Sequence, residues 1–353
     1  MFDLDDLHAL EQADRDGMLA HVRALPEQCR AAWAGVRHLE LPDRYLGANK
    51  VVIAGMGGSA IGGDLAAEVA GPESSIPVLV LRDYELPAYV DRHTLVIGSS
   101  YSGNTEETLA VFQEAHERGC SLVALATGGR LAELAQEWGV PLVCFRYESQ
   151  PRAAMGYNLV SLLGILRALG AVGDLTAALD EATALMAGRL RELEPGSDRV
   201  RNPAKQLAVD LYGHVPVVVG AGPLAPVARR WKTQLNENSK GWSYFEVLPE
   251  MNHNAVSGIH FPPGAAEEIS VLFLTSASIH PRNRLRFELT QQVFEGQGIL
   301  CRRIEASGHF TLAQILTAIQ LGDYVSVYLA ALYGTDPTAI DDIVGLKRRM
   351  TGG

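Results

Sequence analysis

Two short stretches of the sequence combine glycines and hydroxyl side chains in a way that could hold an anion. The first is GMGGS at residues 55–59, which follows the apolar run VVIA. Glycines let a backbone approach an anion closely, and a helix that begins there presents N–H groups to it. The second is SSYSGNTEET at residues 99–108, in which Ser100, Ser102 and Thr105 offer hydroxyls. Together the two stretches predict a phosphate pocket that uses no lysine.

Two other interpretations of these stretches compete with a phosphate pocket. A dinucleotide-binding loop has the spacing GxGxxG and a carboxylate at the end of the next strand. GMGGSAIGG fits GxGxxxxG better, although Asp83 is a plausible ribose acceptor. Alternatively, Ser102 and Thr105 only cap the helix that follows them. A cap explains one hydroxyl, but it does not explain the serine-rich loop together with a second, glycine-rich loop.

The elements that must position these loops alternate between short apolar strands and helices. Within residues 46–150, runs such as KVVIA, TLVIGSS and SLVALA are separated by helical segments such as NTEETLAVFQEAHERG. Continuous apolar strands of this kind indicate a parallel sheet with both faces covered, which is a doubly wound α/β domain. Ligands of such sheets bind beyond the carboxyl ends of the strands, where both loops lie.

The strand–helix alternation then restarts, which indicates an internal duplication. VVIAGMG at residues 51–57 matches PVVVGAG at 216–222, and LVIGSSYS at 95–102 matches LFLTSAS at 272–278. Matched strands and turns in matched order favour duplication over chance similarity. The sequence therefore predicts an N-terminal helical segment (1–45), a first domain (46–150), a helical connection (151–213), a second domain (214–335) and a C-terminal tail (336–353).

The composition limits the classes of function. The 353 residues carry a formal net charge of −11, which argues against a nucleic-acid partner and against anionic membranes. The acidic N-terminus does not resemble a signal peptide, and no apolar run is expected to reach the ~18 residues of a spanning helix. The four cysteines are widely spaced, which is typical of a reducing, cytoplasmic compartment. No HxxxH or HExxH pattern occurs, so we expect no metal site.

The sequence resembles the bifunctional phosphoglucose/phosphomannose isomerases, a family with two sugar isomerase (SIS) domains. The resemblance runs in order through GMGGSAIGGD, SYSGNTEET, PRAAMGY, NENSK, PEMNHNAVSG and QLGDYVSVYLA. It implies two flavodoxin-like SIS subdomains with helical extensions at both ends. It also implies an aldose–ketose isomerase that interconverts glucose 6-phosphate and mannose 6-phosphate with fructose 6-phosphate through a cis-enediolate. Neither a metal nor another cofactor is implied.

The same resemblance assigns roles to individual residues. Glu237 would shuttle the proton between C1 and C2, and Arg152 would face the developing enediolate. His253 would assist ring opening, and it would do so in the site of a partner subunit, which implies a homodimer with shared sites. The phosphate would be bound by Gly57, Gly58, Ser59, Ser100, Ser102 and Thr105.

Two further residues are implied near the C-terminus. Lys347 matches a family lysine that reaches towards the substrate, although basic residues are also favoured at the ends of helices. Thr338 could contact the sugar where the C2 epimers differ. The second domain lacks the full serine–threonine set, and Pro223 removes an N–H, so we expect one phosphate site per chain.

The sequence departs from the family pattern at EASGHFTLAQ, residues 305–314, where His309 stands in place of a more acidic, serine-containing stretch. Two alternative functions remain open. One is a sugar-phosphate-binding regulator with the same pocket and no chemistry, which would not need Glu237 or His253. The other is an SIS isomerase for another sugar phosphate, against which the duplication argues.

Overall fold

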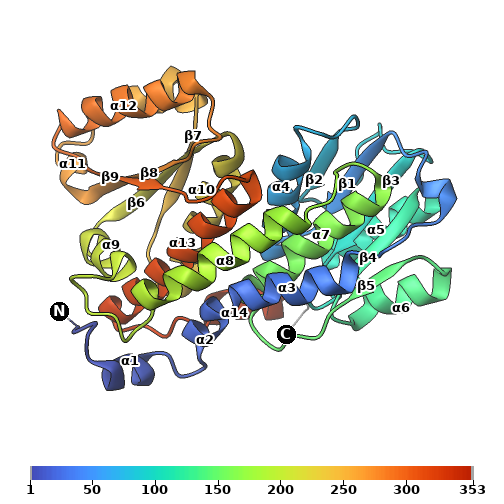
Figure 1. The fold of residues 1–353 in the computed structure, drawn as a ribbon, viewed down its shortest axis with the longest axis horizontal. Coiled ribbons are helices and arrows are strands. Elements are labelled where there is room, and N and C mark those ends of the chain that lie inside the picture. Colours follow the sequence, from blue (N-terminus) through green and yellow to red (C-terminus); the bar gives the residue numbers. More distant parts are fainter. Residues whose placement is uncertain (1, 351–353) are drawn as a thin grey trace. The chain divides into compact units, whose positions relative to one another are not determined.

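The computed structural model describes residues 2–350, which divide into two compact units (Figure 1). Unit 1 takes the residues up to Arg23, then Gly188–Ala306, and those from Thr317 onward. Unit 2 takes Ala24–Ala187 and Ser307–Leu316. Two helices, α8 (Thr176–Leu193) and α13 (Thr311–Tyr333), begin in unit 2 and end in unit 1.

Unit 2 is built on a five-stranded sheet in the order β2-β1-β3-β4-β5, with every neighbouring pair parallel. Its strands are β1 (Lys50–Ala54), β2 (Val78–Leu81), β3 (Thr94–Ser99), β4 (Ser121–Ala126) and β5 (Leu142–Cys144). Its main helices besides α8 are α3 (Leu25–Val36), α4 (Gly57–Ala70), α5 (Glu106–Glu117), α6 (Gly129–Trp138) and α7 (Met155–Leu169).

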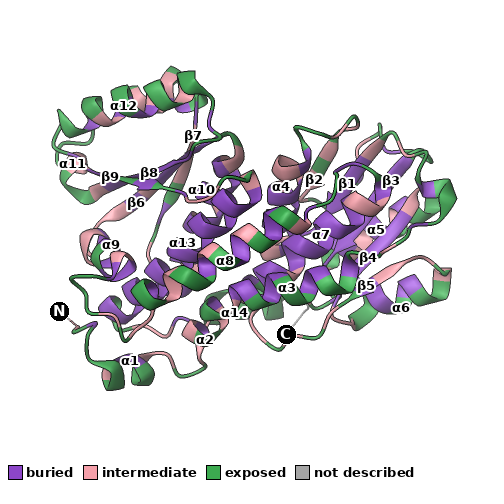
Figure 2. Ribbon diagram, in the orientation of Figure 1, coloured by how far each residue is buried: buried purple, intermediate pink, exposed green. Residues whose placement is uncertain are grey.

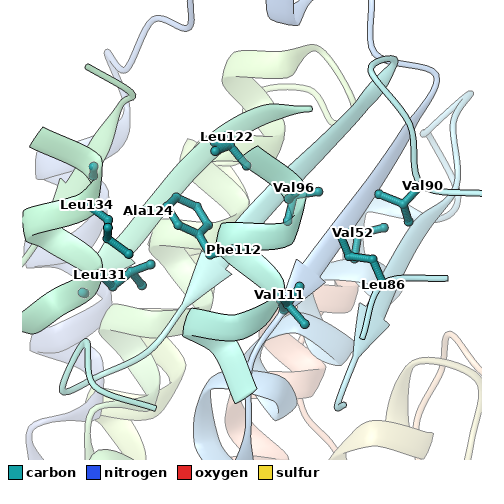
Figure 3. Packing of buried hydrophobic residues seen from close by; sticks show 14 residues of the cluster. Val52, Leu86, Val90, Val96, Val111, Phe112, Leu122, Ala124, Leu131 and Leu134 are labelled. Carbon is teal, nitrogen blue, oxygen red and sulfur yellow. The ribbon is translucent and has the colours of Figure 1, made fainter. Parts of the chain in front are cut away.

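The central strands of this sheet are apolar because both of their faces are covered. Every residue of β3 is buried, and so are the last five residues of β4. Figure 3 shows part of the core, in which Phe112 and Val111 of α5 lie against Val96 of β3 and Leu122 of β4. The continuous apolar runs in the sequence follow from this two-sided burial.

Unit 1 is built on a four-stranded parallel sheet in the order β7-β6-β8-β9. Its strands are β6 (Val215–Ala221), β7 (Tyr244–Leu248), β8 (Ile269–Thr275) and β9 (Leu300–Glu305). Its helices besides the ends of α8 and α13 are α1 (Leu7–Ala13), α2 (Met18–Arg23), α9 (Pro203–Leu211), α10 (Ala225–Ser239), α11 (Ala265–Glu268), α12 (Pro281–Glu295) and α14 (Asp341–Met350).

The two sheets share one topology, which confirms the α/β class with two parallel sheets. The order β2-β1-β3-β4 is repeated by β7-β6-β8-β9. The matched turns also share a backbone conformation, because Gly57 after β1 and Gly222 after β6 both have φ of +51°. Only glycine adopts such angles without strain, which explains why glycine occupies both positions.

One expectation about apolar stretches is wrong. Helix α13 is long and apolar enough to cross a membrane by length and composition. Every residue of its most apolar stretch is nevertheless buried inside the chain, as is usual for the core helix of a globular protein. Polar residues spaced along this helix, such as Gln314, Gln320 and Asp323, break up the apolar run in the sequence.

Candidate functional site

The glycine loop lies between β1 and α4, at the carboxyl edge of the unit 2 sheet. Helix α4 begins at Gly57, and its N-cap residue Met56 makes no side-chain capping hydrogen bond. A Cβ atom on Gly55 would lie 2.9 Å from the carbonyl oxygen of Ser99 and 3.2 Å from Cβ of Ser59. The bare backbone thus lets the ends of β1 and β3 meet, which places the glycine loop beside the start of the serine loop.

The start of α4 also contacts the short 3-10 turn η2 (Pro151–Ala153), which carries Arg152. A Cβ atom on Gly58 would lie 3.4 Å from the carbonyl oxygen of Pro151 and 3.5 Å from Cα of Arg152. Arg152 is only 3% exposed. Unit 2 therefore brings Arg152 next to the glycine loop.

The serine loop is organised around the buried hydroxyl of Ser100. Its Oγ lies 2.8 Å from Oγ1 of Thr105 and accepts a 3.1 Å hydrogen bond from the backbone N–H of Gly103. Ser102 is exposed, and its Oγ accepts from the N–H of Asn104 at 3.2 Å. The loop is thus a compact turn with hydroxyl groups on a helix N-terminus.

Thr105 does not cap the helix that follows it through its side chain. Thr105 occupies the N-cap position of α5, but its side chain makes no capping hydrogen bond there. Its hydroxyl is shared with Ser100 instead. The first turn of α5 also carries Glu106 and Glu107, whose charges favour a helix N-terminus.

A residue that the sequence did not single out holds the Arg152 turn in place. Gln28 of α3 is 2% exposed, and its side-chain amide makes two hydrogen bonds to the backbone that directly follows Arg152. Its Nε2 donates to the carbonyl of Ala153 at 2.8 Å, and its Oε1 accepts from the N–H of Gly156 at 3.1 Å. In the sequence Gln28 is an ordinary polar residue on an amphipathic helix, so no local signal marks it.

Glu237 lies in unit 1, on the last turn of α10, and its side chain is half-buried. The next residue, Asn238, is fully buried, and its Nδ2 donates to Oγ of Ser326 on α13 at 2.9 Å. This bond fixes how α10 is rotated about its axis, and it therefore fixes the direction in which the side chain of Glu237 projects from the helix.

A buried ion pair holds α10 to α13 two turns earlier. Arg230 and Asp323 are 1% and 5% exposed, and Nη2 of the arginine lies 2.7 Å from Oδ2 of the aspartate. The other carboxylate oxygen accepts a 3.1 Å hydrogen bond from Nε2 of Gln234. Removing one partner of such a pair would leave a buried, unpaired charge, so we expect loss of either side chain to destabilise the contact between the two helices.

The segment after α13 carries Thr338, which is 7% exposed. Its backbone N–H donates to Oδ1 of Asp336 at 2.7 Å. The side chain of Lys240 bonds to the backbone carbonyls of both Asp336 and Glu237. Unit 1 therefore brings the Glu237 and Thr338 segments together.

His253 belongs to the 3-10 turn η4 (Glu250–His253), and its side chain is exposed. The preceding residue anchors this turn on α12, because Nδ2 of Asn252 donates to Oγ1 of Thr290 at 2.8 Å. Nη1 of Arg286 donates to Oδ1 of Asn252 at 3.1 Å. The histidine is thus presented to the outside on a fixed turn.

Lys347 lies on α14, a helix with no buried residue, and is itself exposed. The stretch at residues 305–314, which departs from the family pattern, is held by Glu181 of α8. The N–H groups of His309 and Phe310 donate to the two carboxylate oxygens of Glu181 at 2.8 and 2.9 Å, just before α13 begins. Within residues 2–350, no cluster of three histidine, cysteine or carboxylate side chains could hold a metal ion.

A family model and several curated relatives point to one family. Residues 200–350 match the model described as the bacterial phospho-glucose isomerase C-terminal SIS domain. A bifunctional phosphoglucose/phosphomannose isomerase of Caldicellulosiruptor bescii is 38% identical, over 94% of this chain and 98% of that protein. Another from Aquifex aeolicus is 36% identical, over 85% and 90% of the respective chains.

A solved structure supports the same fold. The glucose-6-phosphate isomerase like protein from Thermus thermophilus superposes with a TM-score of 0.63, over 96% of this chain and 99% of that one. At 19% identity this likeness concerns the fold alone.

Proposed function

Because the chain belongs to the bifunctional phosphoglucose/phosphomannose isomerase family, and is therefore an aldose–ketose isomerase, we propose that it converts glucose 6-phosphate and mannose 6-phosphate to and from fructose 6-phosphate. The reaction opens the sugar ring, moves a proton between C1 and C2, and passes through a cis-enediolate. Such proton transfer requires neither a metal ion nor a redox cofactor.

One observation carries this proposal, and it is the arrangement of the two phosphate loops with Arg152. The glycine loop meets the end of β3, the hydroxyls of Ser100 and Thr105 lie 2.8 Å apart, and the turn of Arg152 contacts Gly58. We assign the phosphate to Gly57, Gly58, Ser59, Ser100, Ser102 and Thr105. Helix N-termini of this kind favour a dianion.

The proposed chemistry uses two charged side chains. Glu237 takes the proton from one carbon of the sugar and returns it to the other, for which a half-buried carboxylate on a fixed helix end is suited. Arg152 faces the enediolate oxygen, since a guanidinium is always charged and suits an oxyanion. Thr338 contacts the sugar at C2, and Lys347 reaches towards the substrate.

We further propose that the protein is a homodimer in which His253 acts in the site of the partner subunit and assists ring opening. The exposed histidine supports this, because it stands on a turn anchored to α12. Most of helix α12 is exposed (Figure 2). Its exposed apolar residues include Leu285, Leu289 and Val293, which lie at helical spacing. A second copy of the chain would cover these residues.

Three remaining expectations stay proposals. The protein works in the cytoplasm, without a nucleic-acid or membrane partner. Its two SIS domains span residues 46–150 and 214–335, flanked by segments 1–45, 151–213 and 336–353. The second domain carries no phosphate of its own, because Pro223 lies where the matched loop has an N–H.

The proposal is tested by a coupled assay with purified protein, chelator and no added metal. Each aldose phosphate is supplied separately, and fructose 6-phosphate is measured. We expect turnover of both sugars. Turnover of glucose 6-phosphate alone would contradict the bifunctional assignment. Tight sugar-phosphate binding by calorimetry with no turnover would instead favour a regulator.

A further inference from the structure

Helix α10 ends on a lysine in the left-handed backbone conformation. Lys240 is its C-cap, with φ of 56° and ψ of 11°. Between residues 2 and 350 it is the one residue other than glycine with positive φ. Glycine normally takes this position, because a Cβ atom crowds the following carbonyl oxygen. The side-chain contacts of Lys240 are therefore of interest, because a glycine at this position would lack them.

The side chain of Lys240 turns back onto the end of its own helix. Its Nζ donates to the carbonyl oxygens of Glu237 at 2.9 Å and Asn238 at 3.2 Å. Carbonyl oxygens in the last turn of a helix have no N–H donor within the helix, and a cation there is favoured by the helix dipole. The ammonium group therefore holds the backbone of the turn that carries Glu237.

The same ammonium group reaches a second segment of the chain. It donates to the carbonyl oxygen of Asp336 at 2.5 Å. The carboxylate of Asp336 accepts the backbone N–H of Thr338 at 2.7 Å. One residue, Asp336, thus bonds to Lys240 through its backbone and to Thr338 through its side chain.

We propose that Lys240 is a positioning residue that keeps Glu237 and Thr338 in a fixed arrangement, and that it thereby sets both the rate of proton transfer and the preference between the two C2 epimers. The inference rests on the proposed function, in which Glu237 moves the proton and Thr338 contacts C2. Proton transfer depends on placing the base to within a fraction of an ångström. Glucose 6-phosphate and mannose 6-phosphate differ only at C2. Discrimination between them therefore depends on the position of the Glu237 carboxylate relative to the Thr338 hydroxyl.

Three variants separate the ammonium group from the backbone conformation. Lys240→Gly and Lys240→Asn both accept the left-handed backbone and remove the ammonium group. Lys240→Arg retains a cation that can bond to carbonyl oxygens. Lys232→Gln is the matched control, because it removes a lysine charge from the same helix away from these contacts.

The readouts are kcat and KM for each sugar, together with hydrogen exchange over residues 334–340. For Lys240→Gly and Lys240→Asn we expect kcat to fall about 10-fold or more, with KM changed by less than about 3-fold. We also expect the glucose-to-mannose ratio of kcat/KM to shift by at least about 3-fold, and exchange at 334–340 to accelerate. Lys240→Arg should recover part of each change, and Lys232→Gln should match the wild type.

Two results would overturn the inference. One is a Lys240→Gly protein with wild-type kcat, sugar ratio and hydrogen exchange. The other is an equal loss of kcat for both sugars with unchanged hydrogen exchange at residues 334–340. If Lys240 ties the two segments together, its removal should accelerate that exchange. If the wild-type chain turned over neither sugar, the proposed function would fail, and the exchange measurement would still decide whether Lys240 ties the two segments together.

Discussion

The hydroxyl of Ser100 organises the serine loop, since it meets both the N–H of Gly103 and the hydroxyl of Thr105. Ser100→Ala should therefore raise KM for both sugars about 10-fold or more, because the loop loses a buried partner and the phosphate loses a contact. Steady-state kinetics test this, with Ser75→Ala as the control at an exposed serine. An unchanged KM would contradict a phosphate role for Ser100.

The four thiols differ sharply in surroundings, which predicts their reactivity. Burial raises the pKa of Cys29 and of Cys301 to about 12, and that of Cys120 to about 11. Cys144 is exposed. At pH 8, Ellman's reagent should label one thiol quickly in the native protein, because the thiolate is the reacting form. Cys144→Ser should abolish the fast phase, and a fast phase that persists would contradict the assigned burial.

At the residue scale, sequence reasoning found the groups that could do chemistry but not those that hold them. Ser100, Thr105 and Glu237 lie within short sequence motifs that can be recognised without a structure. Gln28 lies more than a hundred residues from the chain segment it holds, and Lys240 depends on a backbone angle. Neither a long-range contact nor a dihedral angle leaves a local pattern in one sequence.

Close packing between helices α4 and α7 depends on one glycine. A Cβ atom on Gly62 would lie 1.7 Å from Oδ1 of Asn158, whose Nδ2 donates to Oγ of Ser99 beside the serine loop. Gly62→Ala should therefore destabilise the fold by about 1–3 kcal/mol, as overpacking does. Gly188→Ala is the matched control, because nothing lies within 4 Å of its Cβ position.

The control should be neutral or stabilising by about 0.5–1 kcal/mol, because alanine is the better helix former. Urea unfolding of both variants measures the difference. Equal urea midpoints for the two variants would show that the side chain of Asn158 moves to make room for the added methyl group. Helix α4 would then not need a glycine at position 62.

At the element scale, the parallel strands that are buried on both faces were predictable, and the edge strand β7 was not. The residues of β7, Tyr244–Leu248, are mostly half-exposed and include Glu246. An edge strand with polar and aromatic residues lacks the continuous apolar run that marks a central strand. The apolar length of helix α13 was not predicted, because its few polar residues are spread along it.

At the scale of the whole molecule, the shared-site dimer predicts complementation between two inactive variants. Glu237→Gln and His253→Ala should each be inactive alone. After co-expression or subunit exchange, half of the dimers are mixed, and one of their two sites has Glu237 and His253 of the partner subunit intact. Activity should then recover to about a quarter of the wild-type value.

Two controls make this experiment decisive. Mixing Glu237→Gln with a Glu237→Gln/His253→Ala double variant should restore no activity, because no site then has both Glu237 and His253. Native mass spectrometry should show that mixed dimers formed. Mixed dimers without activity, or an active His253→Ala protein, would contradict the donated histidine.

The duplication was predictable because it repeats both an order of elements and a pair of glycine turns, and Gly57 and Gly222 do share one backbone conformation. The expectation of one phosphate site per chain stays a prediction, and it rests on Pro223, which has no counterpart in the first glycine loop. Roles assigned to Arg152, Lys347 and Thr338 stay predictions, because they depend on a bound sugar.

The most direct test of the central claim follows hydrogen at C2. Glucose 6-phosphate is incubated in D₂O with wild-type protein, Glu237→Gln, or Glu288→Gln as an exposed control on α12, and deuterium at C2 is measured by NMR over many turnovers. We predict incorporation with wild type and control, and none with Glu237→Gln, which should still bind the sugar. Incorporation at the wild-type rate by Glu237→Gln, or turnover by wild type without any incorporation, would contradict proton transfer by Glu237.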